Sequence, residues 1–122
     1  MRRSQQSQGL AVPGRIAVRV GDRLLVLCHD DINRVVARNT RCDLHTADEV
    51  LLVRQAFKHL RARLPAGRFL QANRSVMVNR TWIEECRPKS HGDYMVRLRD
   101  GAEIVVSRSR RREFLAALNR IG

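Results

Sequence analysis

The first part of the chain alternates between apolar and polar residues. In RIAVRV, residues 15–20, the aliphatic side chains fall on one face and the arginines on the other, which is the period of two of a half-buried strand. A Gly-Asp pair then provides a turn into RLLVLC, residues 23–28. The pattern predicts two short antiparallel strands. It also predicts that Cys28 shares a face with Leu24 and Val26 and is buried as a small apolar residue.

A second stretch, DDINRVVARNTRCDLHT, residues 30–46, predicts another hairpin. Its tip runs from Arg38 through Asn39 and Thr40 to Arg41 and is polar and doubly basic. The outgoing strand places Cys42, Leu44 and Thr46 on one face.

A period of three to four residues replaces this alternation in ADEVLLVRQAFKHLRAR, residues 47–63. The spacing predicts an amphipathic helix that lies on a sheet. Thr46 and Glu49 have the spacing of a capping box, and Pro65 ends the helix. The apolar stripe consists of Val50, Val53, Phe57, Leu60 and Leu64.

Strand patterns return in the second half. The stretch FLQANRSVMVNRTWIEE, residues 69–85, is interrupted at NRS and at NRT, and each interruption sets an arginine beside small hydrogen-bonding side chains. Within this stretch Trp82 alternates with apolar neighbours and is expected in the core. Asp100-Gly101 is the strongest hairpin signal of the chain. The sequence closes with a short amphipathic helix that reaches Ile121 and stops at Gly122.

These elements predict a mostly β fold with one mid-chain helix and a short C-terminal helix. The length of 122 residues suits one domain. Residues 1–13 are rich in glutamine and serine and end in a Pro-Gly turn, so they are expected to form a disordered leader. The folded domain is expected over residues 14–122.

The charge of the chain points to a polyanionic partner. Its formal net charge is +12, and all but two of the 24 basic residues, Lys58 and Lys89, are arginines. A GC-rich genome explains a preference for arginine over lysine, but it does not explain the excess of base over acid. Nucleic acid is therefore the favoured partner. The aromatic content of 4% disfavours an RNA-binding protein that stacks bases on exposed rings.

The sequence lacks the characteristic motifs of the other function classes. The sequence has no glycine-rich phosphate loop, no H-E-x-x-H and no nucleophile elbow, so we expect no enzyme and no cofactor. Cys28, Cys42 and Cys86 are far apart and show no C-x-x-C spacing, which indicates neither a metal site nor a disulfide framework and fits a reducing cytoplasm. Cys42 and Cys86 stay open as redox-sensitive thiols. No apolar run is long enough for membrane insertion.

The arginines at the expected turns are the candidate DNA-binding residues. Arginine binds guanine or phosphate in a bidentate way, asparagine can read adenine, and hydroxyl groups bind phosphate oxygens. The alternative is that the neighbouring Asn, Ser and Thr residues only close their own turns. The turn candidates are Arg38, Asn39, Arg41, Asn73, Arg74, Arg80 and Arg108.

The start of the terminal helix is a second candidate site. If Ser109 is its N-cap, then Arg110, Arg111 and Arg112 occupy the first turn, where the helix dipole disfavours positive charge by a few tenths of a kcal/mol to about 1 kcal/mol each. A bound phosphate would reverse the sign of that effect. The alternative is a solvated run of charges.

With these elements and motifs, the chain resembles the LytTR family, the DNA-binding domains of a class of bacterial transcriptional regulators. The resemblance covers residues 15–121. It rests on the Asp31-Ile32 step, on the mid-chain helix, and on two segments about thirty residues apart. GRFLQANRSVMVNRTWI resembles the family's central signature, and VVSRSRRREFLAAL resembles its closing segment.

The resemblance implies an elongated β sandwich of short antiparallel strands whose loops enter successive major grooves of DNA. Arg74 and Arg108 match arginines that face the grooves in the family, and the tip from Arg38 to Arg41 matches its first DNA-contacting loop. Ser75 and Asn79 match positions that shape the central loop. Asn73 stands where the family commonly has histidine, which changes the expected base preference.

The resemblance also implies partners and regulation. We expect two copies bound to a repeated or imperfect-palindromic site in double-stranded DNA, with Arg80 and the helix arginines contacting phosphates. Family members often follow a receiver domain, and here only residues 1–14 precede Arg15. Control is therefore expected from expression level, from a partner protein, or from a parent chain of which this sequence is a fragment. The alternative function is a protein-interaction module whose basic face is held by an acidic or membrane-bound inhibitor.

Overall fold

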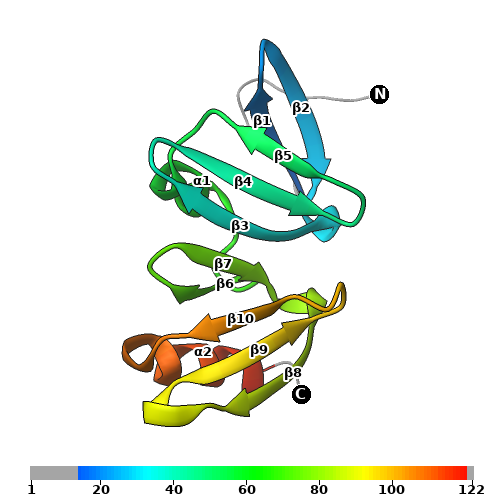
Figure 1. The fold of residues 1–122 in the computed structure, drawn as a ribbon. Coiled ribbons are helices and arrows are strands. Elements are labelled where there is room, and N and C mark those ends of the chain that lie inside the picture. The colour runs from blue at the N-terminus through cyan, green and yellow to red at the C-terminus, as the bar shows by residue number, and fades with distance from the viewer. Residues whose placement is uncertain (1–13, 121–122) are drawn as a thin grey trace.

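The computed structural model describes residues 14–120 (Figure 1). The predicted leader, residues 1–13, and the predicted helix stop at Ile121 and Gly122 lie outside the described residues. The strands are β1 (Arg15–Val20), β2 (Arg23–Cys28), β3 (Ile32–Arg38), β4 (Arg41–Thr46), β5 (Val50–Val53), β6 (Phe69–Asn73), β7 (Val76–Asn79), β8 (Ile83–Pro88), β9 (Tyr94–Leu98) and β10 (Glu103–Val106). The helices are α1 (Phe57–Arg63) and α2 (Arg111–Asn119), and the short 3₁₀ turns are η1 (His29–Asp31), η2 (Arg80–Trp82), η3 (Ser90–Gly92) and η4 (Arg108–Arg110).

Two antiparallel sheets make up the body of the molecule. The larger sheet has seven strands in the order β2-β1-β5-β4-β3-β7-β6, and the smaller has three in the order β10-β9-β8. They follow one another along the long axis of the molecule, with the β6–β7 hairpin between them (Figure 1). The predictions of a mostly β chain, of the first two hairpins and of the hairpin at Asp100-Gly101 are confirmed.

Two clusters of apolar side chains form the core, and the β6–β7 hairpin contributes to both. Phe69 and Met77 pack into the first cluster, under α1 and the inward side of the large sheet. Leu70 and Val78 pack into the second, against the small sheet and Phe114 of α2. The alternation of side chains along a strand explains this division, because successive residues point to opposite faces.

The predicted helix over residues 47–63 is wrong in its first part. Val50–Val53 form strand β5, which pairs with β4 and β1, and the helix begins only at Phe57. The hydroxyl of Thr46 does accept hydrogen bonds from the backbone N–H groups of Asp48 and Glu49, but it closes a turn between strands and caps no helix. Backbone partners on both sides favoured the strand, and β-branched valines suit one.

The predicted burial of Cys28 is also wrong. Leu24, Val26 and Cys28 all face solvent, and the opposite face of β2 packs on the core through Leu25 and Leu27. Register decides this, since Leu25 and Leu27 lie opposite the buried residues Val18 and Ile16 of β1. Both faces of RLLVLC are apolar, so its sequence does not show which one turns inward.

The other two cysteines are shielded. Cys42 is fully buried, and burial raises the pKa of its thiol to about 11. Burial also raises the pKa of the half-buried Cys86. A raised pKa lowers the thiolate fraction, which disfavours both residues as redox sensors. Trp82 is buried as expected, and its indole N–H donates to the carbonyl of Asp30 at 3.0 Å.

His29, in the turn η1, is a buried histidine. It is 6% exposed and packs edge-on against Phe69, with 6.0 Å between ring centroids. Within residues 14–120 neither ring nitrogen has a hydrogen-bond partner. Burial and the nearby Arg68 guanidinium lower the pKa of His29. The folded state therefore favours the neutral imidazole.

We predict that the free energy of unfolding decreases as the pH is lowered from about 7.5 to about 5.5. The unfolded chain binds protons at histidine near its ordinary pKa, whereas folded His29 resists protonation, so stability is lost as the pH falls. His45, whose pKa is also lowered by burial, acts in the same direction. Urea unfolding at both pH values measures the effect. His29→Leu should reduce the pH dependence, and the exposed His59→Gln should leave it unchanged; an unchanged dependence in His29→Leu would contradict the assignment.

Candidate nucleic-acid interface

Four turns that are distant in sequence meet along one edge of the molecule. The N–H of Ala37, at the β3–β4 tip, donates to the carbonyl of Ser75 in the β6–β7 turn at 2.8 Å. The N–H of Ser107, after β10, donates to the carbonyl of Ala72 at 2.9 Å. Asp93, in the β8–β9 turn, accepts the N–H of Arg108 at 3.0 Å. The turns form a continuous row, visible on the left side of Figure 1, which we name the arginine edge.

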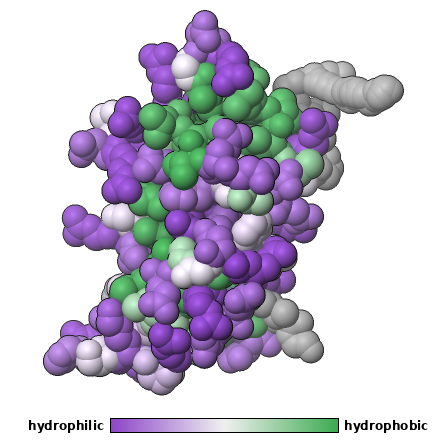
Figure 2. All heavy atoms as spheres, turned by 45° about the vertical axis from the view of Figure 1, so that its right-hand side comes forward, coloured by the Kyte–Doolittle hydropathy of each residue, from purple (hydrophilic) through white to green (hydrophobic). Residues whose placement is uncertain are grey.

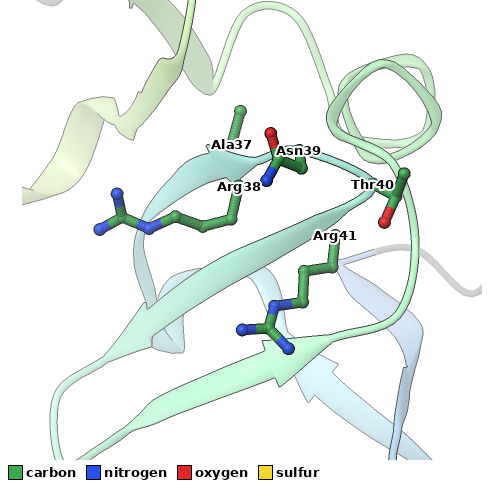
Figure 3. Close-up of a pocket in the computed structure, with 5 residues that line it drawn as sticks. All are labelled: Ala37, Arg38, Asn39, Thr40 and Arg41. Carbon is green, nitrogen blue, oxygen red and sulfur yellow. The ribbon is translucent and has the colours of Figure 1, made fainter.

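At the β3–β4 tip two guanidiniums lie on the same face of the hairpin. Arg38 and Arg41 are direct cross-strand partners, and both are exposed around an open hollow of about 570 Å³ (Figure 3). Like charges directly opposite one another are destabilising. Asp43 compensates Arg38 through an ion pair of 2.8 Å, whereas Arg41 has no carboxylate partner within residues 14–120. Asn39 adopts a left-handed conformation (φ 53°), which asparagine tolerates better than most residues.

In the β6–β7 turn the side chain of Asn73 forms hydrogen bonds within the protein. Its amide NH₂ donates to the carbonyl of Val105 at 2.8 Å, and its oxygen accepts the N–H of Ser75 at 2.9 Å. Asn73 therefore shapes this turn and ties it to β10, and this geometry does not favour the expected base contact. Arg74, between the two bonded residues, is exposed at the apex.

The β8–β9 turn supports the arginines that follow β10. Gly92 lies against Arg108 so closely that a methyl group on Gly92 would come within 2.9 Å of Arg108 Cδ. The Gly92 carbonyl accepts a hydrogen bond of 3.1 Å from Arg111, whose guanidinium lies 5.5 Å from the ring centroid of Tyr94. These contacts hold Arg108 and Arg111 beside the turn.

The terminal helix begins differently from the prediction. Residues Arg108–Arg110 form the turn η4, and α2 starts at Arg111 with Arg110, not Ser109, as its N-cap residue and with no side-chain cap. The arginines spread apart as a result. Arg110 is half-buried and lines a groove of about 390 Å³ between α1 and α2, whereas Arg112 is exposed.

Arg80 lies away from the arginine edge. It follows β7, whereas Arg74 precedes that strand, so the length of β7 separates them. Its turn η2 is tied to η1 through Asn79, a fully buried residue whose amide donates to the carbonyls of His29 and Ile32 at 3.0 and 2.8 Å. The expected shaping role of Asn79 thus concerns this opposite edge. The structure brings all other predicted turn arginines together but not Arg80.

The β8–β9 turn is a part of the arginine edge that no motif in the sequence indicated. Lys89, Ser90 and His91 are exposed there, and His91 has a positive φ of 63°. The pattern Ser-His-Gly-Asp is typical of a turn, but only the contacts of Gly92 and Asp93 with Arg108 place it beside the other three turns.

The sequence pattern of the LytTr DNA-binding domain family matches residues 22–119. The chain belongs to the LytTR family of DNA-binding domains. The fold agrees, because a LytTr DNA-binding domain from Bacillus cereus superposes with a TM-score of 0.76 at 17% identity, covering 88% of this chain and 98% of that one.

Similar proteins include three bacterial regulators. The sensory transduction protein LytT of Enterococcus faecalis is 28% identical over 99 residues, covering 81% of this chain and 41% of that protein. LytT of Bacillus subtilis is 26% identical over 105 residues, covering 86% and 44%. The transcriptional regulatory protein YpdB of Escherichia coli is 29% identical over 119 residues, covering 90% and 49%. The chain thus spans about half the length of these relatives.

Residues 14–120 contain no group of three or more His, Cys, Asp or Glu side chains that could hold a metal ion. None of the helices described is long and apolar enough to cross a membrane.

We predict that Gly92→Ala weakens DNA binding beyond its effect on stability. The new methyl group would displace the Arg108 side chain, and the positive φ of 83° would strain the backbone by about 1–2 kcal/mol. Fluorescence anisotropy with a labelled duplex measures affinity, and urea unfolding measures stability.

Gly101→Ala is the matched control. Gly101 also has a positive φ, 89°, but a methyl group there meets nothing within 4 Å, and its turn lies at the opposite edge. Both variants should lose similar stability, and only Gly92→Ala should lose DNA affinity. Equal affinities for the two variants would show that Gly92 does not position Arg108.

Proposed function

We propose that the chain binds specific sites in double-stranded DNA through the arginine edge and acts in the cytoplasm as a bacterial transcriptional regulator, or as the DNA-binding part of one. The observation that carries this proposal is the hydrogen-bonded row of four turns, which collects exposed arginines from separate parts of the sequence on one side of the molecule. The family membership of the chain supports it.

The distribution of charge favours one orientation on DNA. At the arginine edge the guanidiniums of Arg41, Arg74 and Arg108 form no ion pair within the described residues. At the opposite edge Arg34 and Arg68 are paired with Asp100 and Asp30. Unpaired positive charge attracts a polyanion more strongly than charge that carboxylates already compensate, so the arginine edge is the favoured side.

The proposed contacts fall into two classes. Arg74, Arg108 and the tip from Arg38 to Arg41 sit at turn apices that can reach into major grooves, so we assign them to base recognition. Arg111 and Arg112 lie at the uncapped start of α2, where N–H groups and guanidiniums both suit phosphate, so we assign them to backbone contacts. Asn73 is assigned a positioning role.

We further propose that two copies bind a repeated or imperfect-palindromic site. Selection from random duplex DNA followed by sequencing tests the function directly. Enrichment of two short motifs spaced by about one helical turn is the expected result. Recovery of unrelated sequences would contradict sequence-specific binding, and a single motif would contradict the binding of two copies.

Arg74→Ala should weaken binding to the selected site by about 1 to 3 kcal/mol and binding to random DNA much less, because a base contact is lost. Competition titrations with both duplexes measure the two losses. Arg80→Ala, at the opposite edge, is the control and should change neither affinity. Equal losses on the two duplexes would make Arg74 a phosphate contact.

Arg112→Ala should weaken binding to all duplexes alike and reduce the slope of log affinity against log salt by about one unit, because one phosphate contact is lost. Titrations at several salt concentrations measure the slope. Arg87→Ala is a suitable control, since Arg87 pairs with Glu85 and Glu103 on the small sheet. An unchanged slope in Arg112→Ala would remove it from the interface.

A further inference from the structure

The end of the large sheet formed by β1, β2 and β5 carries an uncovered apolar surface. Leu24 and Val26 are 60% and 53% exposed, and Val50 and Leu52 are each 49% exposed. Figure 2 shows hydrophobic surface gathered at this end of the molecule. We name these four residues the apolar face.

Strand register explains why these side chains point outward. Val18 of β1 and Leu51 and Val53 of β5 occupy the buried positions, so their neighbours face the other side. At the β6–β7 end of the same sheet, Leu70 and Val78 are covered by the small sheet. No element within residues 14–120 covers the β1–β2–β5 end.

Exposed apolar clusters of this kind mark interaction sites. A monomeric soluble protein rarely exposes a contiguous apolar patch of more than a few hundred Å², and the largest patch is often functional. The four half-exposed aliphatic side chains lie on β2 and β5, the strands on either side of β1. The apolar face lies on the strands of the sheet rather than at the turns of the arginine edge, so DNA binding does not account for it.

The charges around the apolar face restrict what can cover it. Arg15 and Arg19 lie across from Cys28 and Leu24 and share their outward side. Arg54 follows β5 and is exposed, and its guanidinium donates to the carbonyl of Gly21, in the β1–β2 turn, at 3.2 Å. None of these arginines forms an ion pair within residues 14–120. The outward positions of β1, β2 and β5 carry no carboxylate. On the neighbouring strand β4, Asp43 lies opposite Leu52, and its carboxylate already pairs with Arg38.

A second copy of the chain does not suit the arginines that surround the apolar face. A stable interface buries roughly 800 Å² per partner, which is more than the apolar face provides, so the bordering residues must contribute. In a symmetric pair the same arginines would meet one another, and the chain already carries a net charge of +12. Like charges brought together in an interface are unfavourable.

We propose that the apolar face binds a protein partner whose contact segment has an apolar centre flanked by Asp and Glu side chains. The partner's apolar residues cover Leu24, Val26, Val50 and Leu52, and its carboxylates pair with Arg15, Arg19 and Arg54. A regulator with this second surface can hold DNA at one edge and a protein on the sheet face.

Selection of binders from a random peptide library displayed on phage tests the proposal. The full chain serves as bait, and a Leu24→Ser/Leu52→Ser variant removes peptides that bind elsewhere, including the arginine edge. The expected result is a pool enriched in both aliphatic and acidic residues, whose members bind the double variant about tenfold or more weaker than the natural chain. Failure to enrich such peptides, or a pool without excess acid, would overturn the proposal.

Matched variants separate the contribution of the apolar side chains to peptide binding from that of the arginines. Leu24→Met/Leu52→Met keeps the surface apolar and should retain peptide binding, whereas Arg19→Gln/Arg54→Gln should weaken it and reduce its salt dependence. All these side chains are exposed, and circular dichroism and urea unfolding check that each variant folds. The serine variant should bind the selected DNA site normally; loss of DNA binding together with peptide binding would show that the two surfaces are not separate.

Sedimentation velocity of the chain without DNA tests whether a second copy of the chain, instead of an acidic partner, covers the apolar face. We expect a monomer for the natural chain and for the serine variant. Self-association that the Leu24→Ser/Leu52→Ser change abolishes would identify a second copy as the occupant and overturn the acidic partner.

Discussion

The pairing of β7 with β3 connects the two halves of the molecule. Because of it, the β6–β7 hairpin extends the large sheet while its other face packs against the small sheet and α2. The hairpin also lies between the β3–β4 tip and the segment after β10, with backbone hydrogen bonds to both. If β7 shifted by one residue along β3, each side chain of the hairpin would change face, both apolar clusters would lose residues, and Arg74 would no longer lie between the other turns.

The arginine edge gathers like charges that local stability does not favour. Arg38 and Arg41 face each other across a hairpin, and Arg111 and Arg112 stand at the positive end of a helix. Partial compensation comes from Asp43 and from the contacts of Arg111 with Gly92 and Tyr94. The remaining uncompensated charge is consistent with a polyanionic partner. Asn73 and Asp93 use their side chains to connect turns, which shows that several polar groups of the edge serve geometry rather than recognition.

Errors of the sequence-based predictions occurred where a local pattern admits two structures. Val50, Val53 and Phe57 have helical spacing, yet Val50–Val53 became a strand because β4 and β1 supplied backbone partners. RLLVLC is apolar on both faces, and only its register with β1 turned Leu25 and Leu27 inward and left Cys28 exposed. Arg74 and Arg80 sit in similar Asn-Arg-Ser/Thr contexts, but the strand between them sends them to opposite edges. Local spacing contains no information on these choices.

The amino-acid sequence was enough to predict the mostly β character, the hairpins at Asp22, Asn39 and Gly101, the family and the preference for a polyanion. Those properties follow from side-chain alternation, turn residues, two specific motifs and net charge, all of which are local or additive. The tertiary structure alone decided which turns become neighbours, which face of β2 and β5 stays exposed, and that Gly92 and Asp93 support Arg108. These depend on strand order and register and on contacts between separate segments, such as the hydrogen bond from Ala37 to Ser75.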